Sequence, residues 1–337
     1  MPLVHAGCTS EAGRAPDAPP PLASVRTFSL GRDTSETPGD ITYAAASSAG
    51  IAIVDNASRV LVTYSTDGRR RWSVPFGAGD TAGVRQPNAL SWWRDTLLLA
   101  EVDGAGGVWS VDTAGHAHRL TRLAMETAIT SVERLDDGYL VATTESDARL
   151  EADSAIALRV FDAKGRATHA GCRLDTRYVE SARRRGMASI FRSFSATSSE
   201  RFVFCRQPLS REVIVMSPTL DSVGTITLPG WRPIGDERQS MDLISINHFR
   251  ASLVEWTGMW YAQRALVVAG ATYDERAGRD RFIVVRCGEE GSASCAVFSS
   301  EERVIGLLAD SVVSVVTRPS IGAPMQLRVS TFPLASP

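Results

Sequence analysis

Residues 59–68, Arg-Val-Leu-Val-Thr-Tyr-Ser-Thr-Asp-Gly, form a short strand-like run that ends in a glycine turn. The same unit returns at 107–115, Gly-Val-Trp-Ser-Val-Asp-Thr-Ala-Gly, and at 157–165, Ala-Leu-Arg-Val-Phe-Asp-Ala-Lys-Gly. The glycine that ends each unit follows the previous one by 47 and then by 50 residues. Periods of about 40–50 residues that are built from short strands are typical of β-propeller blades.

The rest of the chain extends this pattern. Short runs of β-branched and large apolar residues, bounded by Gly, Asp and Asn, favour strands over helices. Grouped in fours, the strands predict blades at 41–76, 88–123, 129–174, 187–228 and 249–299. One strand is left at the N-terminus, at 25–30, and three are left at the C-terminus, near 304–308, 311–317 and 325–331. We therefore predict an all-β, six-bladed β-propeller of four-stranded antiparallel blades, whose last blade is closed by the N-terminal strand.

The N-terminal residues 1–23 are predicted to be a disordered tail or a tether, and 24–337 a single propeller domain. Residues 4–8, Val-His-Ala-Gly-Cys, resemble the end of a bacterial lipoprotein signal, which implies a lipid anchor at Cys8. The basic and apolar segments that precede such a site are missing, so a plain tail is the alternative. The expected location is extracytoplasmic, in the periplasm or at the cell surface, with the cytoplasm left open.

Charge and hydropathy exclude some classes of protein. The formal net charge of −2 argues against a nucleic-acid partner, which would require a clear basic excess. No run of about 18 apolar residues is present that could span a membrane. Lys164 is the only lysine among the 36 basic residues. The excess of arginine reflects either codon usage in a GC-rich genome or recognition of phosphate or carboxylate groups.

The cysteines suggest an oxidising compartment. Cys287 and Cys295 flank a predicted hairpin loop, where their Cα atoms could approach within the roughly 7 Å that a disulfide needs. With Cys8 set aside, the remaining four, Cys172, Cys205, Cys287 and Cys295, form an even set. Four buried free thiols are the alternative, and the sequence does not determine the pairing.

No common catalytic motif is present. The chain has no Gly-x-Ser-x-Gly, no phosphate loop, no His-Glu-x-x-His and no Cys-x-x-Cys. His116 and His118 alternate on one strand and therefore share a face. We expect an exposed pair on an outer strand rather than a metal site, because a third ligand is not visible.

Two pieces of sequence carry a family resemblance. Residues 51–56, Ile-Ala-Ile-Val-Asp-Asn, and 160–165, Val-Phe-Asp-Ala-Lys-Gly, resemble the repeat of NHL-type six-bladed propellers. The resemblance covers about 40–175 and fades in the next blades, where 216–220, Met-Ser-Pro-Thr-Leu, holds the turn without glycine. It implies a scaffold but no single activity, because the family includes binding modules, scaffold proteins and a few lyases and hydrolases.

Related six-bladed lactonases hold calcium in the central channel with Glu, Asn and Asp side chains. By this resemblance, acidic and amide residues near the strand ends are candidate calcium ligands. They are Asp55, Asn56, Asn88 and Asp103, with Asp136 and Asn247 as further candidates. Several of these could instead form turns through their own backbone.

The aromatic residues suggest a binding surface. Trp256 and Trp260 bracket a predicted turn at 257–259, and Trp260 and Tyr261 are expected at its tip. Packing between blades is the alternative for these residues and for the Trp92–Trp93 pair. Trp231 and Arg232 lie in a long predicted insertion at 229–248, and a short helix is predicted at 178–186.

These observations favour a non-enzymatic extracytoplasmic scaffold that binds a protein, peptide or glycan on its loop face. The site would comprise Trp231, Arg232, Trp256, Trp260 and Tyr261. No cofactor is expected, and any membrane contact would be through Cys8. One alternative is a calcium-dependent hydrolase or lyase, so enzymatic activity stays open. Another is a structural subunit of a larger bacterial assembly.

Overall fold

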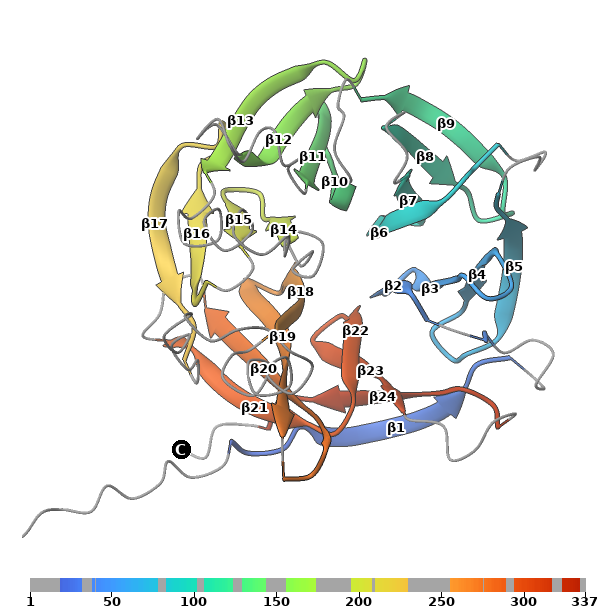
Figure 1. The fold of residues 1–337 in the computed structure, drawn as a ribbon, viewed down its shortest axis with the longest axis vertical. Coiled ribbons are helices and arrows are strands. Elements are labelled where there is room, and N and C mark those ends of the chain that lie inside the picture. The colour runs from blue at the N-terminus through green and yellow to red at the C-terminus, as the bar shows by residue number, and fades with distance from the viewer. Residues whose placement is uncertain are drawn as a thin grey trace, which may run out of the picture.

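The computed structural model describes residues 19–31, 38–39, 41–77, 83–101, 106–123, 129–143, 156–173, 195–207, 210–229, 255–274, 276–288, 294–316 and 323–333. Their strands form six four-stranded sheets that stand in a ring around a central axis (Figure 1). Consecutive strands of each sheet pair antiparallel. The predicted six-bladed all-β propeller is therefore confirmed.

Each of the first five blades is a simple meander that runs from the axis to the rim. Blade 1 holds β2 (Tyr43–Ser47), β3 (Gly50–Asp55), β4 (Val60–Tyr64) and β5 (Arg70–Pro75). Blade 2 holds β6 (Pro87–Trp93), β7 (Thr96–Glu101), β8 (Gly107–Val111) and β9 (Ala117–Arg122). Blade 3 holds β10 (Ile129–Leu135), β11 (Gly138–Thr143), β12 (Ile156–Asp162) and β13 (Ala167–Arg173). Blade 4 holds β14 (Ser195–Ser198), β15 (Val203–Arg206), β16 (Glu212–Met216) and β17 (Ser222–Thr227). Blade 5 holds β18 (Glu255–Ala262), β19 (Ala265–Asp274), β20 (Arg279–Gly288) and β21 (Ala296–Ser300).

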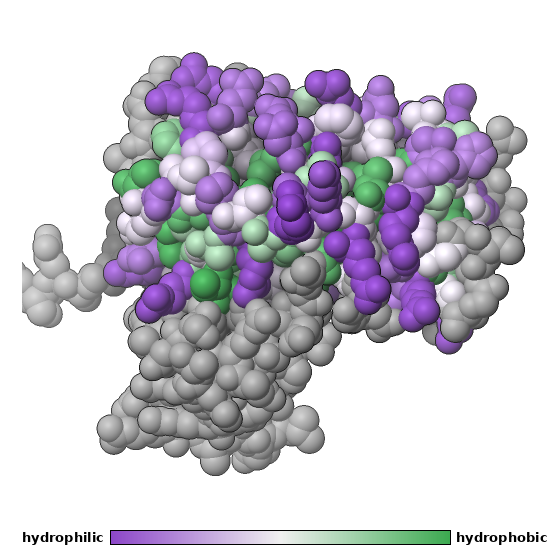
Figure 2. Space-filling view, turned by 90° about the horizontal axis from the view of Figure 1, so that it is seen from above, coloured by the Kyte–Doolittle hydropathy of each residue, from purple (hydrophilic) through white to green (hydrophobic). Residues whose placement is uncertain are grey.

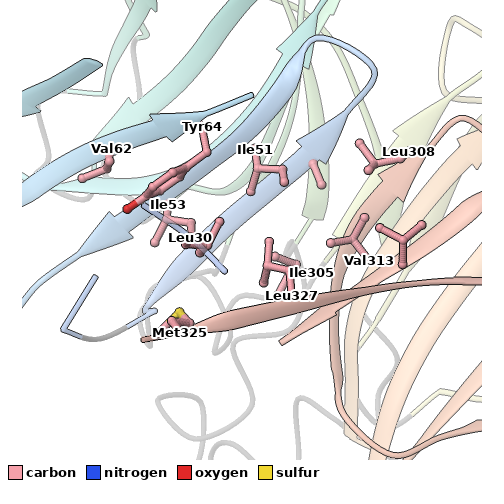
Figure 3. Packing of buried hydrophobic residues seen from close by; sticks show 12 residues of the cluster. Leu30, Ile51, Ile53, Val62, Tyr64, Ile305, Leu308, Val313, Met325 and Leu327 are labelled. Carbon is pink, nitrogen blue, oxygen red and sulfur yellow. The ribbon is translucent and has the colours of Figure 1, made fainter. Parts of the chain in front are cut away.

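Blade 6 is assembled from both ends of the chain, as predicted. It holds β22 (Arg303–Leu308), β23 (Ser311–Val316) and β24 (Gln326–Thr331), and its outer strand is β1 (Ala23–Ser29). The core between blades 6 and 1 contains Leu30 from the N-terminal segment, Ile51 and Ile53 from β3, and Leu327 from β24 (Figure 3). Burial of these side chains closes the ring, because apolar area removed from water stabilises the contact by about 25 cal/mol per Å².

The recurring turn between the third and fourth strands has a polar cap at its first residue. In blade 2, Asp112 Oδ1 accepts hydrogen bonds from the main-chain N–H groups of Ala114 (2.8 Å) and His116 (2.9 Å). Asp162 makes the same pair of bonds in blade 3, to Lys164 and Arg166. Ser65 and Ser217 occupy this position in blades 1 and 4. The repeat in the sequence is therefore a repeat of turn chemistry.

The fourth residue of this turn, counted from the capping residue, has a left-handed backbone conformation. Gly68, Gly115 and Gly165 have φ values of 87°, 88° and 78°. Leu220 takes the same position in blade 4 with a φ of 65°, so the turn forms there without glycine, as predicted. Glycine is required at Gly68, because a Cβ would come within 2.4 Å of the Ser29 main-chain oxygen.

The two faces of the ring differ in their connections. The first strand of each blade joins the second through a tight turn, at 48–49, 94–95, 136–137, 199–202, 263–264 and 309–310. We call the face that carries these turns the short-turn face. The chain passes from blade to blade at the opposite face. The predicted helix at 178–186 and the insertion at 229–248, from residue 230 on, fall in those connections and lie outside the described residues.

The rim is formed by the outermost strands. The described part of the side seen in Figure 2 is mostly hydrophilic, with smaller apolar areas between the polar side chains.

Part of the predicted tail is attached to this rim: Leu22 N–H donates to the Ser299 oxygen, and Ser299 N–H donates to the Pro20 oxygen, each at 2.9–3.0 Å. Cys8 lies outside the described residues. In the described part of the chain, no helix is long and apolar enough to cross a membrane.

Two disulfides are present. Cys287–Cys295 closes the predicted hairpin of blade 5. Cys172–Cys205 joins β13 of blade 3 to β15 of blade 4, with a Cα–Cα distance of 6.5 Å. The alternative of four free thiols is therefore wrong in this structure.

Candidate ligand cavity on the propeller axis

A cavity of about 510 Å³ lies on the axis of the ring. Its wall is formed by the innermost strands of all six blades: β2, β6, β10, β14, β18 and β22. Each is the edge strand of its sheet, so one row of its backbone N–H and C=O groups has no neighbouring strand. The cavity is therefore surrounded by backbone donors and acceptors as well as by side chains.

Small residues dominate the described wall, including Ala44, Ala89, Thr130, Ser131 and Ala196. They are small because six strands converge on the axis. At Gly306 of β22, for example, a Cβ would lie 2.6 Å from the Ala46 main-chain nitrogen of β2. The inner strands could not approach so closely with larger side chains there.

Four aromatic side chains add apolar area to the lining: Tyr43, Trp92, Trp260 and Tyr261. Trp92 Nε1–H donates to the Ala45 oxygen across the boundary of blades 1 and 2 (3.2 Å). Trp260 folds back over Gly258, where a Cβ would be 2.3 Å from the indole. Tyr261 stacks on Phe204 of blade 4, with ring centroids 5.4 Å apart. All four are half-buried and are held by contacts within the scaffold, Tyr43 through the hydrogen bond that its hydroxyl donates to Asn88.

Glu133 on β10 is the one carboxylate among the described residues of the lining. It is half-buried and accepts a hydrogen bond from Ser198 Oγ on β14 (2.8 Å). Burial raises the pKa of Glu133 to about 7, although the hydroxyls of Thr197 and Ser198 favour its charged form. The cavity therefore contains one group that changes charge near neutral pH.

Arg206 on β15 provides a fixed positive charge in the wall. Its side chain is fully buried, and its Nη2 donates to Ser195 Oγ (3.2 Å) and to the Trp256 oxygen (3.4 Å). Its Nη1 donates to the Gln207 oxygen (3.1 Å). These bonds connect blade 4 to blade 5 and offset part of the cost of burying the guanidinium.

Asp55, one of the predicted calcium ligands, has a structural role that it shares with Glu101, a residue not among the predicted ligands. Asp55 is buried, and its carboxylate accepts hydrogen bonds from the N–H groups of Gly39 (2.7 Å) and Ala57 (3.0 Å). Glu101 does the same at the end of β7, where it accepts from Arg85 N–H (2.7 Å). In both blades a carboxylate at the end of the second strand therefore holds the segment that enters the blade.

Asn88 lies at the start of β6 and lines the cavity. It accepts from the Tyr43 hydroxyl of blade 1 and donates to the Ile129 oxygen of blade 3. Its amide is therefore committed to joining three blades. Asn56 is exposed in the turn after β3, and Asp136 is exposed in the turn after β10.

The described acidic residues do not converge on one point. Asp103 and Asn247 lie outside the described residues. In the ranges that the structure describes, no group of three or more His, Cys, Asp or Glu side chains could hold a metal ion. His118 lies on outer strand β9 and His116 directly precedes it; both are exposed, with ring centroids 6.5 Å apart.

The predicted binding residues are separated. Trp231 and Arg232 lie outside the described residues. The predicted turn at 257–259 is wrong, because these residues continue β18 across a bulge. Trp256 is therefore not at a surface but in the core between blades 4 and 5, 1% exposed. Trp260 and Tyr261 line the cavity instead of a loop tip.

Sequence reasoning missed Glu133 and Arg206. A signal for Glu133 exists, since Ser131 and Glu133 are polar at alternate positions of a predicted inner strand. Arg206 gives no such signal, because its neighbours Val203, Phe204 and Cys205 predict an ordinary buried strand.

Comparison with known proteins supports the fold. No family model and no curated protein sequence matches the chain. A candidate exported protein from Bacteroides fragilis NCTC 9343 is 10% identical, with a TM-score of 0.58 over 92% of this chain and 96% of that one. A member of the DUF4221 family from Bacteroides vulgatus ATCC 8482 is 8% identical, with a TM-score of 0.57 over 91% and 97%. A protein of unknown function from Bacteroides caccae is 12% identical, with a TM-score of 0.50 over 82% and 91%. At these identities the likeness shows the fold alone, and the NHL-type resemblance stays a prediction.

Proposed function

We propose that this protein is an extracytoplasmic binding scaffold that takes a small ligand into the cavity on its axis. The observation that carries the proposal is the cavity itself, which has about 510 Å³ of space and is walled by the edge strands of all six blades. Ligand sites are typically concave, of about 300–1,000 Å³, and combine apolar walls with a few fixed polar groups. Ala, Ser and Thr side chains, four aromatic rings and one carboxylate provide that combination here.

The chemistry of the wall supports binding rather than metal-dependent catalysis. The carboxylate of Asp55 and the amide of Asn88 already make structural hydrogen bonds. A metal-dependent hydrolase or lyase needs converging acidic or amide ligands at the channel mouth. Since Asp103 lies outside the described residues, calcium-dependent chemistry remains the alternative to test.

The lining fits a short peptide or a glycan. Hydroxyl groups and free backbone edges can exchange hydrogen bonds with amides or sugar hydroxyls. The half-buried rings of Trp92 and Trp260 offer apolar area to either ligand. A larger protein partner could insert a terminus or a side chain into the same space.

An extracytoplasmic location is supported by the two disulfides, which form and persist in oxidising compartments. The similar Bacteroides fragilis structure belongs to a candidate exported protein, which agrees with this location. A lipid anchor at Cys8 stays a prediction.

The test is a mouth-blocking variant. Ser48 is exposed in the β2–β3 turn and lines the cavity, so Ser48→Tyr would place a ring at the mouth with little effect on the core. Thr113→Tyr is the matched control, because Thr113 is exposed in the β8–β9 turn of the same face and does not line the cavity. Calorimetric titration with chitotriose, maltotriose and trialanine would supply the probes.

We expect at least one of these probes to bind to the wild type and to Thr113→Tyr with equal affinity, and at least tenfold more weakly to Ser48→Tyr. Equal binding by both variants, or binding of none of the three probes, would contradict the proposal for this class of ligand.

A further inference from the structure

One exposed aromatic residue on the short-turn face lies outside the cavity lining. Trp93, at the end of β6, is 38% exposed. The Arg94 guanidinium lies 5.0 Å and the Arg134 guanidinium 5.7 Å from the centroid of its ring. We call Trp93, Arg94 and Arg134 the Trp93 patch. It joins blade 2 to blade 3, because Arg134 comes from the end of β10.

The two arginines are positioned by aromatic rings rather than by acids. Arg134 also lies 4.7 Å from the ring centroid of the buried Tyr139. Stacking positions a guanidinium in advance, so less entropy is lost when those of its N–H groups that are not bonded within the protein bind an anion.

Carboxylates occur in the same turns, yet the arginines do not pair with them. Asp95 follows Arg94, and Asp136 and Asp137 follow Arg134 by two and three positions. In the described part of the chain, neither Arg94 nor Arg134 forms an ion pair. Other exposed arginines do pair, as in Arg166–Asp162 at 2.9 Å. The Trp93 patch therefore presents two ordered guanidinium groups that form no ion pair in the described part of the chain, and Arg134 also hydrogen-bonds to the side chain of Tyr139.

We infer that the Trp93 patch binds an acidic segment of a partner protein, with one carboxylate on Arg94 and another on Arg134. Guanidinium groups bind carboxylates through two parallel hydrogen bonds. Both guanidinium groups lie within 6 Å of one ring centroid, so they can meet carboxylates on alternate residues of an extended segment, which are about 7 Å apart.

The composition of the patch supports a protein partner. Trp and Arg are enriched among the residues that dominate protein–protein affinity. A glycan would need an open face of the indole for stacking, and guanidinium groups lie over this ring. The inference goes beyond the proposed cavity ligand, since no residue of the patch lines the cavity.

The test uses fluorescence anisotropy with a labelled peptide that alternates glutamate and glycine. We expect saturable binding that Arg94→Gln and Arg134→Gln each weaken about tenfold, as for the loss of a charge-assisted hydrogen-bond pair. Arg94→Lys should weaken binding as well, because lysine retains the charge without the two-pronged donor geometry. Arg70→Gln is the matched control: Arg70 is exposed on the same face, where it bonds to Ser73, and its loss should change binding by less than about twofold.

Three results would overturn the inference. The first is no saturable binding of the acidic peptide by the wild type. The second is a loss in Arg70→Gln equal to that in Arg94→Gln, which would indicate net charge alone. The third is binding of a heparin-derived hexasaccharide that depends on Arg94 while the peptide does not bind, which would assign the patch to a glycan. None of these results depends on whether the cavity is occupied.

Discussion

Ser198 of blade 4 donates a hydrogen bond of 2.8 Å to the carboxylate of Glu133 in blade 3. The contact joins two inner strands at the wall of the cavity. Ser131 Oγ, two residues before Glu133, donates to the Ala196 oxygen across the same boundary (3.3 Å). The Cys172–Cys205 disulfide joins the same two blades farther from the axis. Polar and covalent contacts therefore both hold blade 3 to blade 4.

Glu133 should make stability depend on pH near neutrality. Its pKa is raised from 4.5 to about 7 in the folded protein, so the folded state holds the proton more tightly than the unfolded state. Stability from this group is therefore complete below pH 4.5 and is lost as the pH rises through 7. At about 1.4 kcal/mol per pKa unit, and allowing for partial exposure, the loss is about 1–3 kcal/mol.

The measurement compares urea unfolding of the wild type and Glu133→Gln between pH 5 and 8. Because all other groups are shared, the difference between the two proteins isolates Glu133. We expect the wild type to lose stability relative to Glu133→Gln as the pH rises. A constant difference would show that the carboxyl has an ordinary pKa.

The disulfide between blades should contribute more than the disulfide within blade 5. Cys172–Cys205 spans 33 residues and Cys287–Cys295 spans 8. The chain-entropy estimate gives about 3–4 kcal/mol for the longer loop and about 2–3 kcal/mol for the shorter one. Unfolding of the two Cys→Ala double variants would measure both losses. Peptide mapping without reductant should find both pairs in the wild type, and a different pairing would refute the assignment.

The turn glycine Gly68 should resist substitution. Gly68→Ala would place a Cβ 2.4 Å from the Ser29 oxygen at a left-handed φ of 87°. We expect a loss of at least about 2 kcal/mol of unfolding free energy. Gly224→Ala on β17 is the control, because a Cβ there meets nothing within 4 Å, and it should change stability by less than about 0.5 kcal/mol. Similar losses of stability in both variants would contradict a left-handed Gly68 packed against the Ser29 oxygen.

Closure of the ring by the N-terminal strand can be tested within one short segment. Leu30, directly after β1, is fully buried against blades 1 and 6, whereas Val25 on β1 is 60% exposed. Leu30→Ala should cost about 2–5 kcal/mol, and Val25→Ala should cost less than about 0.5 kcal/mol. Chemical denaturation provides both values. Equal and small effects would indicate that the N-terminal strand does not close blade 6.

The sequence was sufficient to predict the architecture, because the blade repeat is encoded locally. The turn glycines Gly68, Gly115 and Gly165 recur at nearly constant spacing and identify the blade repeat, and grouping the predicted strands in fours gives the number of blades without any knowledge of long-range contacts. Counting the strands also predicted that the N-terminal strand completes the sixth blade and closes the ring. The pairing of Cys172 with Cys205 could not be predicted, since it depends on how two neighbouring blades pack.

The candidate site was far less accessible to prediction. Asp55 and Asn88 have the residue types of calcium ligands, but their side chains make hydrogen bonds to segments that are distant in the sequence. Trp256 and Trp260 are four positions apart, yet a bulge in β18 separates their environments, so that one is in the core and the other lines the cavity. Such differences arise from tertiary packing, which residue type and spacing do not specify.

Thermal unfolding of the EDTA-treated protein, with and without millimolar calcium, is the most direct test of a metal-free ligand cavity. A ligand that binds only the folded state raises the unfolding midpoint by mass action. We predict that calcium leaves the midpoint unchanged, because the described carboxylates and amides near the axis make structural hydrogen bonds. A rise of several degrees that EDTA reverses would contradict this prediction and would favour a calcium-dependent enzyme.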